Sequence, residues 1–234
     1  MNKNIYIVLF LLFSLVQCKK GFQTRKLVYR DKVFAFFTLK KEEFEYKKYI
    51  PDNLNHPFHR LSENAVQTAF GKIHYRKTSS IGEFHDALFH KKDLERLAEI
   101  LVQVVERAKK DEIVIAILLS NESDSVLPSY TRTTMLFWID KQMKMNVVFG
   151  DLDRFVPYDT VNHFSDWGQM TPIRIAHIID SNEIMPSKYY SYGKVRGFNN
   201  KRWLVFDLND QEKFKLKKNE DVNPPETKVK IKKN

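Results

Sequence analysis

The stretch KKDEIVIAILLSN (residues 109–121) decides the fold. Seven consecutive apolar residues, 113–119, lie between charged and polar neighbours. An unbroken apolar run is typical of a strand that is buried on both faces, because successive side chains of a strand point to opposite sides. The run is short for a helix and rich in β-branched residues. We therefore predict a buried strand at the centre of a sheet.

Two amphipathic helices are predicted before this strand. Residues 92–109 carry apolar side chains at helical spacing, with acidic residues at the start and basic residues at the end, which complements the helix dipole. A shorter apolar stripe runs from Leu61 to Ile73, and Ser62 is placed to cap its first turn. Stripes of this kind usually pack against a core.

The rest of the body has the pattern of β-structure. Residues 27–39 predict a strand or hairpin, and residues 77–83 and 120–130 predict loops. Later strands are expected at 131–139 and 143–149 (a hairpin), at 173–179, and at 195–198 and 202–206 (a hairpin around Asn199 and Asn200). The predicted fold class is α+β: a mixed, mostly antiparallel sheet with two amphipathic helices packed on one face.

The charge of the chain lies at its two ends. The net charge is +10, but residues 49–210 carry twenty basic and twenty-one acidic residues. Residues 18–48 and 211–234 carry ten against four and eight against four. A nucleic-acid-binding protein usually has its basic residues on a folded face, so we expect no nucleic-acid partner. We predict a single domain at 27–210 and a basic, disordered tail at 211–234.

The amino terminus has the organisation of an export signal. Lys3 precedes an apolar run, residues 5–16, that only Ser14 interrupts. A membrane-spanning helix needs about 20 apolar residues, so this run is too short to remain as a span. A positive start followed by a short apolar run predicts a signal peptide at 1–17. An ordinary cleaved signal and an uncleaved helical anchor are the alternatives.

The only cysteine, Cys18, follows this run directly. An exported chain with one cysteine has no internal disulfide partner, and attachment of a lipid would use its thiol. Leu15-Val16-Gln17-Cys18 resembles the lipobox of bacterial lipoproteins. Gln17 departs from the usual small residue and is similar to the relaxed lipoboxes of spirochaetes. The resemblance implies diacylglycerol and a fatty acid such as palmitate on Cys18.

A basic linker, residues 18–26, would follow the lipid. Its cations are placed to face phospholipid headgroups, although a merely flexible tether is equally consistent with them; they are Lys19, Lys20, Arg25 and Lys26. The body, from the amphipathic helix through KKDEIVIAILLSN to the following strand pair, resembles uncharacterised envelope lipoproteins of Gram-negative bacteria.

Catalytic signatures are sparse. The sequence contains neither GxSxG nor a Gly-rich nucleotide loop, and its cysteine is assigned to the anchor, so no cofactor is expected. Asp151, Asp153 and His163, with Asp166 nearby, are candidate ligands for a divalent metal in the loop 151–166. Loop aromatics are candidate contact residues: Phe155, Tyr158, Phe164, Trp167, Tyr189, Tyr190 and Tyr192.

The sequence is consistent with two functions. The first is a non-enzymatic lipoprotein, exported and anchored to the envelope (most simply the outer membrane) through its lipid, which binds another envelope protein or a surface ligand. The second is a metal-dependent hydrolase centred on the loop 151–166.

Overall fold

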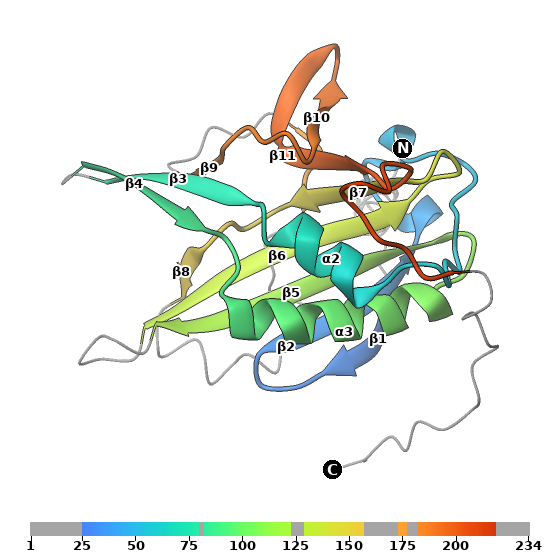
Figure 1. The fold of residues 1–234 in the computed structure, drawn as a ribbon, viewed down its shortest axis with the longest axis horizontal. Coiled ribbons are helices and arrows are strands. Elements are labelled where there is room, and N and C mark those ends of the chain that lie inside the picture. Colours follow the sequence, from blue (N-terminus) through green and yellow to red (C-terminus); the bar gives the residue numbers. More distant parts are fainter. Residues whose placement is uncertain (1–24, 80–81, 123–128, 157–172, 177–181, 219–234) are drawn as a thin grey trace, which may run out of the picture.

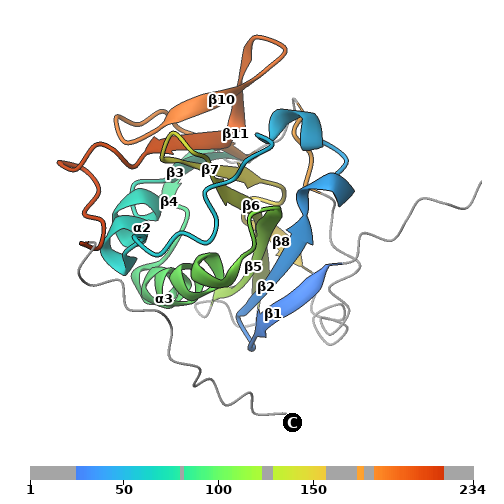
Figure 2. The same cartoon turned by 90° about the vertical axis from the view of Figure 1, so that its right-hand side faces the viewer.

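The computed structural model describes residues 25–79, 82–122, 129–156, 173–176 and 182–218. Its main layer is an eight-stranded sheet in the order β1-β2-β5-β6-β7-β11-β10, with β8 paired to β6. A smaller sheet, β4-β3-β9, projects beside it, and helices α2 and α3 cover one face of the main sheet (Figure 1; Figure 2). The predicted α+β class is confirmed. Every strand pairing that the structure describes is antiparallel.

The described elements follow one another in a simple order. They are β1 (Lys26–Arg30), β2 (Phe34–Lys40), the short 3-10 helices η1 (Lys41–Glu43) and η2 (Lys47–Tyr49), α2 (Glu63–Phe70), β3 (His74–Ser79), β4 (Gly82–Ala87), α3 (Lys91–Arg107), β5 (Glu112–Glu122), β6 (Ser129–Ile139), β7 (Lys144–Phe149), β8 (Arg154–Val156), β9 (Asn182–Ile184), β10 (Ser191–Val195) and β11 (Phe198–Asp207).

Strand β5 is the centre of the main sheet, as the apolar run predicts. It pairs with β2 on one side and with β6 on the other. Its alternate side chains enter two different cores: Val114, Ala116 and Leu118 pack under the helices, and Ile113, Ile115 and Ile117 pack on the opposite side. Both faces of the sheet are therefore buried, which explains why β5 has no polar alternation.

The helix-side core forms because both helices direct an apolar stripe onto the sheet. The Ser62 hydroxyl accepts a hydrogen bond from the backbone N–H of Ala65 at 3.0 Å, so the predicted cap is confirmed. Helix α3 buries seven residues of its stripe, including Leu97, Leu101 and Val105. They pack with aromatic side chains such as Phe70 and Phe206, whose rings stack 6.3 Å apart.

The opposite face of the sheet is covered by the segment between β2 and α2. Phe44, Ile50 and Leu54 of this segment pack with Trp138 and Trp203 in the second core. His56 fastens the segment to the sheet: its imidazole lies 2.8 Å from the Glu112 carbonyl oxygen, and it accepts a bond from the Ile139 backbone N–H at 3.2 Å.

The predictions for one loop and for the turn of one hairpin are wrong. Residues 77–83 were predicted to form a loop, but β3 and β4 pair from His74 to Ala87 on either side of residues 80–81. The last hairpin turns at Arg196 and Gly197, both with positive φ (51° and 86°), and not at Asn199 and Asn200. Asn200 is buried, because its side chain bonds to the Ala176 carbonyl and the Arg202 backbone.

Two further boundaries differ from the prediction. Residues 173–176 are described without a strand, and residues 177–181 of that expected strand lie outside the described residues. The first part of the expected tail from 211 is packed, because Phe214 is 1 % exposed and contacts Phe206. Lys217 also donates its backbone N–H to the Arg60 carbonyl and pairs with Glu106 at 2.6 Å. The packed part of the chain therefore continues to about residue 218.

Candidate functional site

The first carboxylate of the expected metal loop, Asp151, is held by arginines. It lies two residues after the end of β7, and its side chain is 4 % exposed. Arg132 of β6 donates to Asp151 Oδ2 from Nε at 2.7 Å and from Nη2 at 2.6 Å. Arg154 adds a contact to Oδ1 at 3.3 Å. A carboxylate that two guanidinium groups already neutralise is a structural ion pair and a poor metal ligand.

The second carboxylate, Asp153, also has partners within the domain. The Tyr75 hydroxyl of β3 donates to Asp153 Oδ2 at 2.6 Å, and Lys77 Nζ lies 3.6 Å from the same oxygen. His163 and Asp166 lie outside the described residues. Among the positions that the structure describes, no three His, Cys, Asp or Glu residues are grouped as a metal site. The described geometry therefore gives the metal-dependent hydrolase no support.

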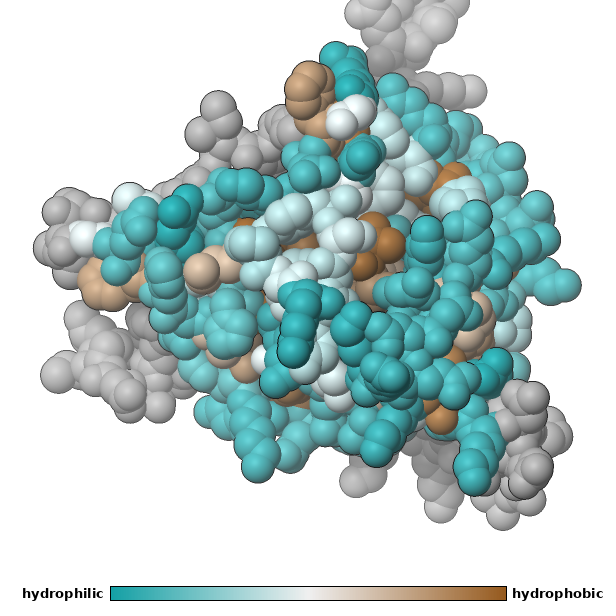
Figure 3. All heavy atoms as spheres, turned by 45° about the horizontal axis from the view of Figure 1, so that its top comes forward, coloured by the Kyte–Doolittle hydropathy of each residue, from teal (hydrophilic) through white to brown (hydrophobic). Residues whose placement is uncertain are grey.

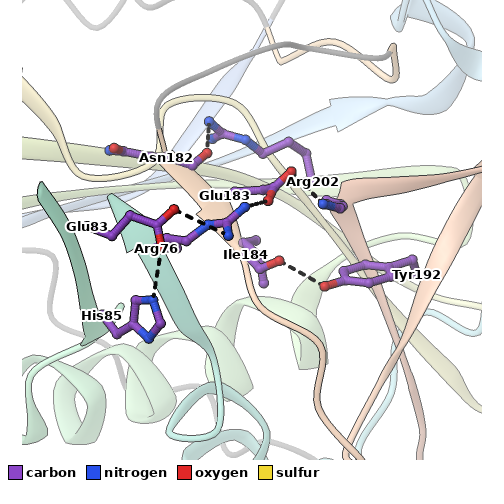
Figure 4. Close-up of polar contacts among 9 residues, drawn as sticks. Arg76, Glu83, His85, Asn182, Glu183, Ile184, Tyr192 and Arg202 are labelled. Carbon is purple, nitrogen blue, oxygen red and sulfur yellow. Dashed lines mark hydrogen bonds and ion pairs between the residues drawn. The ribbon is translucent and has the colours of Figure 1, made fainter. Parts of the chain in front are cut away.

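A surface network of charges joins the small sheet to the main sheet (Figure 4). We call this network the ionic seam and define it as Arg76, Glu83, Glu183 and Lys201. Arg76 of β3 pairs with Glu183 of β9 at 2.6 Å and with Glu83 of β4 at 3.5 Å. Lys201 of β11 pairs with the other Glu183 oxygen at 2.5 Å. The seam thus connects strands of both sheets.

Glu183 is the central carboxylate of the ionic seam. Hydrogen bonds from Lys201 and then Arg76 hold the pKa of Glu183 below its ordinary value of 4.5, although burial opposes this shift. The nearby His85 ring lies 4.0 Å from Glu83. Since the side chains of the seam are roughly 35–54 % exposed, each pair contributes little stability by itself. The seam orients the small sheet more than it stabilises it.

A buried arginine also connects the small sheet to the main sheet. Arg202 of β11 is 3 % exposed and donates to the Gly150 carbonyl at 3.1 Å and the Asn182 carbonyl at 3.0 Å. The Asn182 side chain in turn donates to the Leu152 carbonyl at 2.7 Å. Strand β9 is therefore attached to β11 and to the segment after β7. No local sequence signal indicates this role, because the contacting residues are up to 52 positions apart.

The expected contact aromatics divide into two groups. Tyr190 is buried and its hydroxyl donates to the Met185 carbonyl; Tyr192 donates to the Ile184 carbonyl at 2.8 Å. Burial raises the pKa of Tyr192 to about 12 and raises the pKa of Tyr190 as well, so both remain neutral donors. These two tyrosines are packing residues. Phe155 is 62 % exposed, and Tyr158, Phe164 and Trp167 lie outside the described residues.

On the face that Figure 3 shows, exposed apolar side chains form separate spots. The face that carries β10, β11 and the β3–β4 hairpin is mostly hydrophilic, with separate apolar spots (Figure 3). Large exposed apolar residues of the described chain are Leu27, Phe84, Phe155 and Phe198. Phe84 lies in β4, which forms one edge of the small sheet and is exposed along most of its length.

A groove between α2 and α3 is polar. Glu63 of α2 and Lys92, Glu95, Arg96 and Glu99 of α3 line it. Arg96 pairs with Glu99 at 2.6 Å and donates to the Tyr29 hydroxyl at 2.7 Å. Because its three acidic and two basic side chains are of mixed sign, the groove has no pronounced preference for a cation or an anion.

Comparisons with known proteins identify no relative. No family model matches the chain, and no curated protein or solved structure shows significant similarity to it. Within the described residues, no helix is both long and apolar enough to cross a membrane.

Proposed function

We propose that this protein is a lipid-anchored, non-enzymatic binding domain of a bacterial cell envelope. The observation that carries this proposal is the position of Cys18, directly after the apolar run and eight residues before Lys26, where the first strand begins. Eight residues span at most about 28 Å even when fully extended. An acyl chain on Cys18 would therefore hold the domain close to the membrane surface.

A binding role agrees with the polar chemistry of the described domain. Asp151, Asp153 and Glu183 each accept bonds or ion pairs from side chains of the same chain. The contacts of Asp153 and Glu183 join the two sheets, and those of Asp151 lie within the main sheet. They support a domain that presents a surface, whereas the metal-dependent hydrolase would need carboxylates with open coordination positions.

The projecting β3–β4 hairpin is the surface that we assign to an envelope protein partner. An edge strand offers unpaired backbone groups to an incoming strand, and side-chain contacts then give specificity. Strand β4 lies at the edge of its sheet, and Phe84, 48 % exposed, stands on it with exposed charged neighbours. An exposed aromatic on such an edge is a suitable anchor for a partner.

The lipid anchor is tested by replacing Cys18 with serine. Wild-type protein grown with a clickable palmitate analogue is expected to be labelled, because the processed cysteine carries acyl chains. Cys18→Ser is expected to lose all labelling and to keep its signal, since the thioether cannot form. Gel fluorescence and the mass of the protein measure both effects. A control substitution at the partly exposed Ser187, Ser187→Cys, adds a thiol elsewhere and should not restore labelling in the Cys18→Ser background. Labelling that persists without Cys18 would contradict the anchor.

The binding surface is tested by site-specific crosslinking. A photoreactive phenylalanine analogue at position 84 is expected to give one discrete protein adduct in intact envelopes. The same analogue at Phe198, which is 69 % exposed, serves as the control and is expected to give no such adduct. Identical adducts at both positions, or none at position 84, would count against the hairpin as a partner site.

A further inference from the structure

The two basic ends of the chain emerge at the same end of the domain. Lys26 pairs in register with Thr38 of β2, and Lys40 at the end of β2 pairs with Glu112 at the start of β5. Lys217 pairs with Glu106 in the last turn of α3, a few residues before the same Glu112. The chain therefore enters β1 and leaves after residue 218 beside the α3–β5 turn.

This end carries cations of the folded body as well. We call it the anchor pole and define it by exposed basic residues: Lys26, Lys40, Arg107, Lys109, Lys110 and Lys218. It is the right-hand end in Figure 1 and faces the viewer in Figure 2, where α3 ends and β5 begins. The neutral total of the body in the sequence conceals this local group of cations, although exposed acids follow Lys40 at Glu42, Glu43 and Glu45.

Most acids at the anchor pole are already engaged. Glu112 is 9 % exposed and its carboxylate accepts the Lys109 backbone N–H at 3.0 Å. Glu106 is paired with Lys217, and Asp140 accepts the backbone N–H groups of Gln142 and Lys144. Glu42 is paired with Lys47 at 2.9 Å, and Asp111 and Glu45 are further exposed acids of this end. At the α3–β5 turn, three exposed basic residues, Arg107, Lys109 and Lys110, outnumber the exposed acid Asp111.

We propose that the anchor pole lies against an anionic phospholipid surface, so that the domain has a fixed orientation on its membrane. This inference rests on the proposed lipid anchor, because the short chain from Cys18 leads to Lys26 at this pole. Basic residues close to an anionic leaflet are attracted within about a Debye length, and exposed Leu27 beside Lys26 adds an apolar contact. The same orientation points the β3–β4 hairpin, at the opposite end in Figure 1, away from the membrane.

Lysine footprinting of the lipidated protein tests this orientation. Purified protein is incorporated into vesicles of phosphatidylglycerol and phosphatidylcholine, or of phosphatidylcholine alone, and treated with a membrane-impermeant amine reagent. Lys109 and Lys110 are expected to react about fivefold more slowly on the anionic vesicles, the occupancy that one lysine gains at such a surface. Lys91 and Lys92, exposed at the other end of α3, are the matched internal control and should react equally on both.

Two variants sharpen the test. Lys109→Gln/Lys110→Gln is expected to reduce the protection of Lys26 and Lys40, whereas Lys91→Gln/Lys92→Gln, with the same change of charge, should leave it intact. Raised salt should remove the protection, since it screens exposed charges. If the Cys18 peptide carries its lipid mass and Lys109 and Lys110 still react equally on both vesicles, the orientation is wrong and the anchor stands. If the lipid mass is absent, both proposals fail.

Discussion

Asp151→Ala is expected to lower the free energy of unfolding by about 3–5 kcal/mol, the usual cost of removing one partner of a buried ion pair. The substitution leaves Arg132, whose side chain is 16 % exposed, without its carboxylate acceptor. It also removes the contact with Arg154. Urea unfolding followed by tryptophan fluorescence measures the change. The domain should unfold at a clearly lower urea concentration with a similar slope.

An exposed ion pair of equal length provides the control for Asp151. Glu99 accepts a bond from Arg96 at 2.6 Å, but both side chains are more than 40 % exposed. Glu99→Ala is expected to cost less than about 1 kcal/mol, because water replaces the lost partner. Arg132→Met combined with Asp151→Ala should be less destabilising than the sum of the two single variants, since both ends of the pair are removed together. Equal losses for Asp151→Ala and Glu99→Ala would show that Asp151 is not a buried partner.

Acidification from pH 6.5 to pH 4 is expected to remove about 3 kcal/mol of stability through His56. Burial lowers the pKa of His56 from 6.5 to about 4, and the bond to the Glu112 carbonyl opposes this only in part. The neutral ring is also required by its contacts. Nε2 accepts the Ile139 backbone N–H, so the proton must be on Nδ1, which donates to the Glu112 carbonyl. A second proton would remove the acceptor.

The direction of the His56 effect follows from proton counts. Between pH 6.5 and pH 4 the unfolded chain has a protonated His56, whereas the folded protein keeps it neutral. The unfolded state therefore binds more protons in this range. The contribution of His56 to the free energy of unfolding is fully present above pH 6.5 and decreases as the pH falls. His56→Asn should be less stable at neutral pH but should depend less on pH in this window. His85→Asn, at an exposed position, should keep the wild-type slope. An unchanged slope in His56→Asn would contradict the assignment; unfolding curves at several pH values measure it.

The sequence by itself determined those parts of the fold whose burial follows from the local pattern of apolar residues. The run 113–119 predicted a strand covered on two faces, and the apolar stripe of α3 predicted a helix packed on a core; both predictions are confirmed. The cap at Ser62 and the hairpin of β6 and β7 were also readable, because each depends on neighbours close in the chain.

The tertiary structure decided the elements whose conformation depends on distant partners. Residues 77–79 of β3 and 82–87 of β4 have no apolar alternation, and β4 is exposed along most of its length. They are strands because β3 and β4 pair with each other. Asn200 looked like a turn residue, but a bond to Ala176 makes it a buried part of β11. Similarly, the sequence made Asp151 a candidate metal ligand, but the fold brings Arg132, nineteen positions earlier, into contact with its carboxylate.

The same division applies to function. The apolar run before Cys18 and the basic segments at both ends are local features, and the sequence alone indicates a lipid anchor from them. Whether the two basic segments act together depends on where the chain enters and leaves the folded domain. Only the pairing of β1 with β2 and of Lys217 with Glu106 brings Lys26 and Lys218 to one pole. Antiparallel strand order and helix packing, which no local pattern encodes, fix where the chain enters β1 and where residue 218 lies.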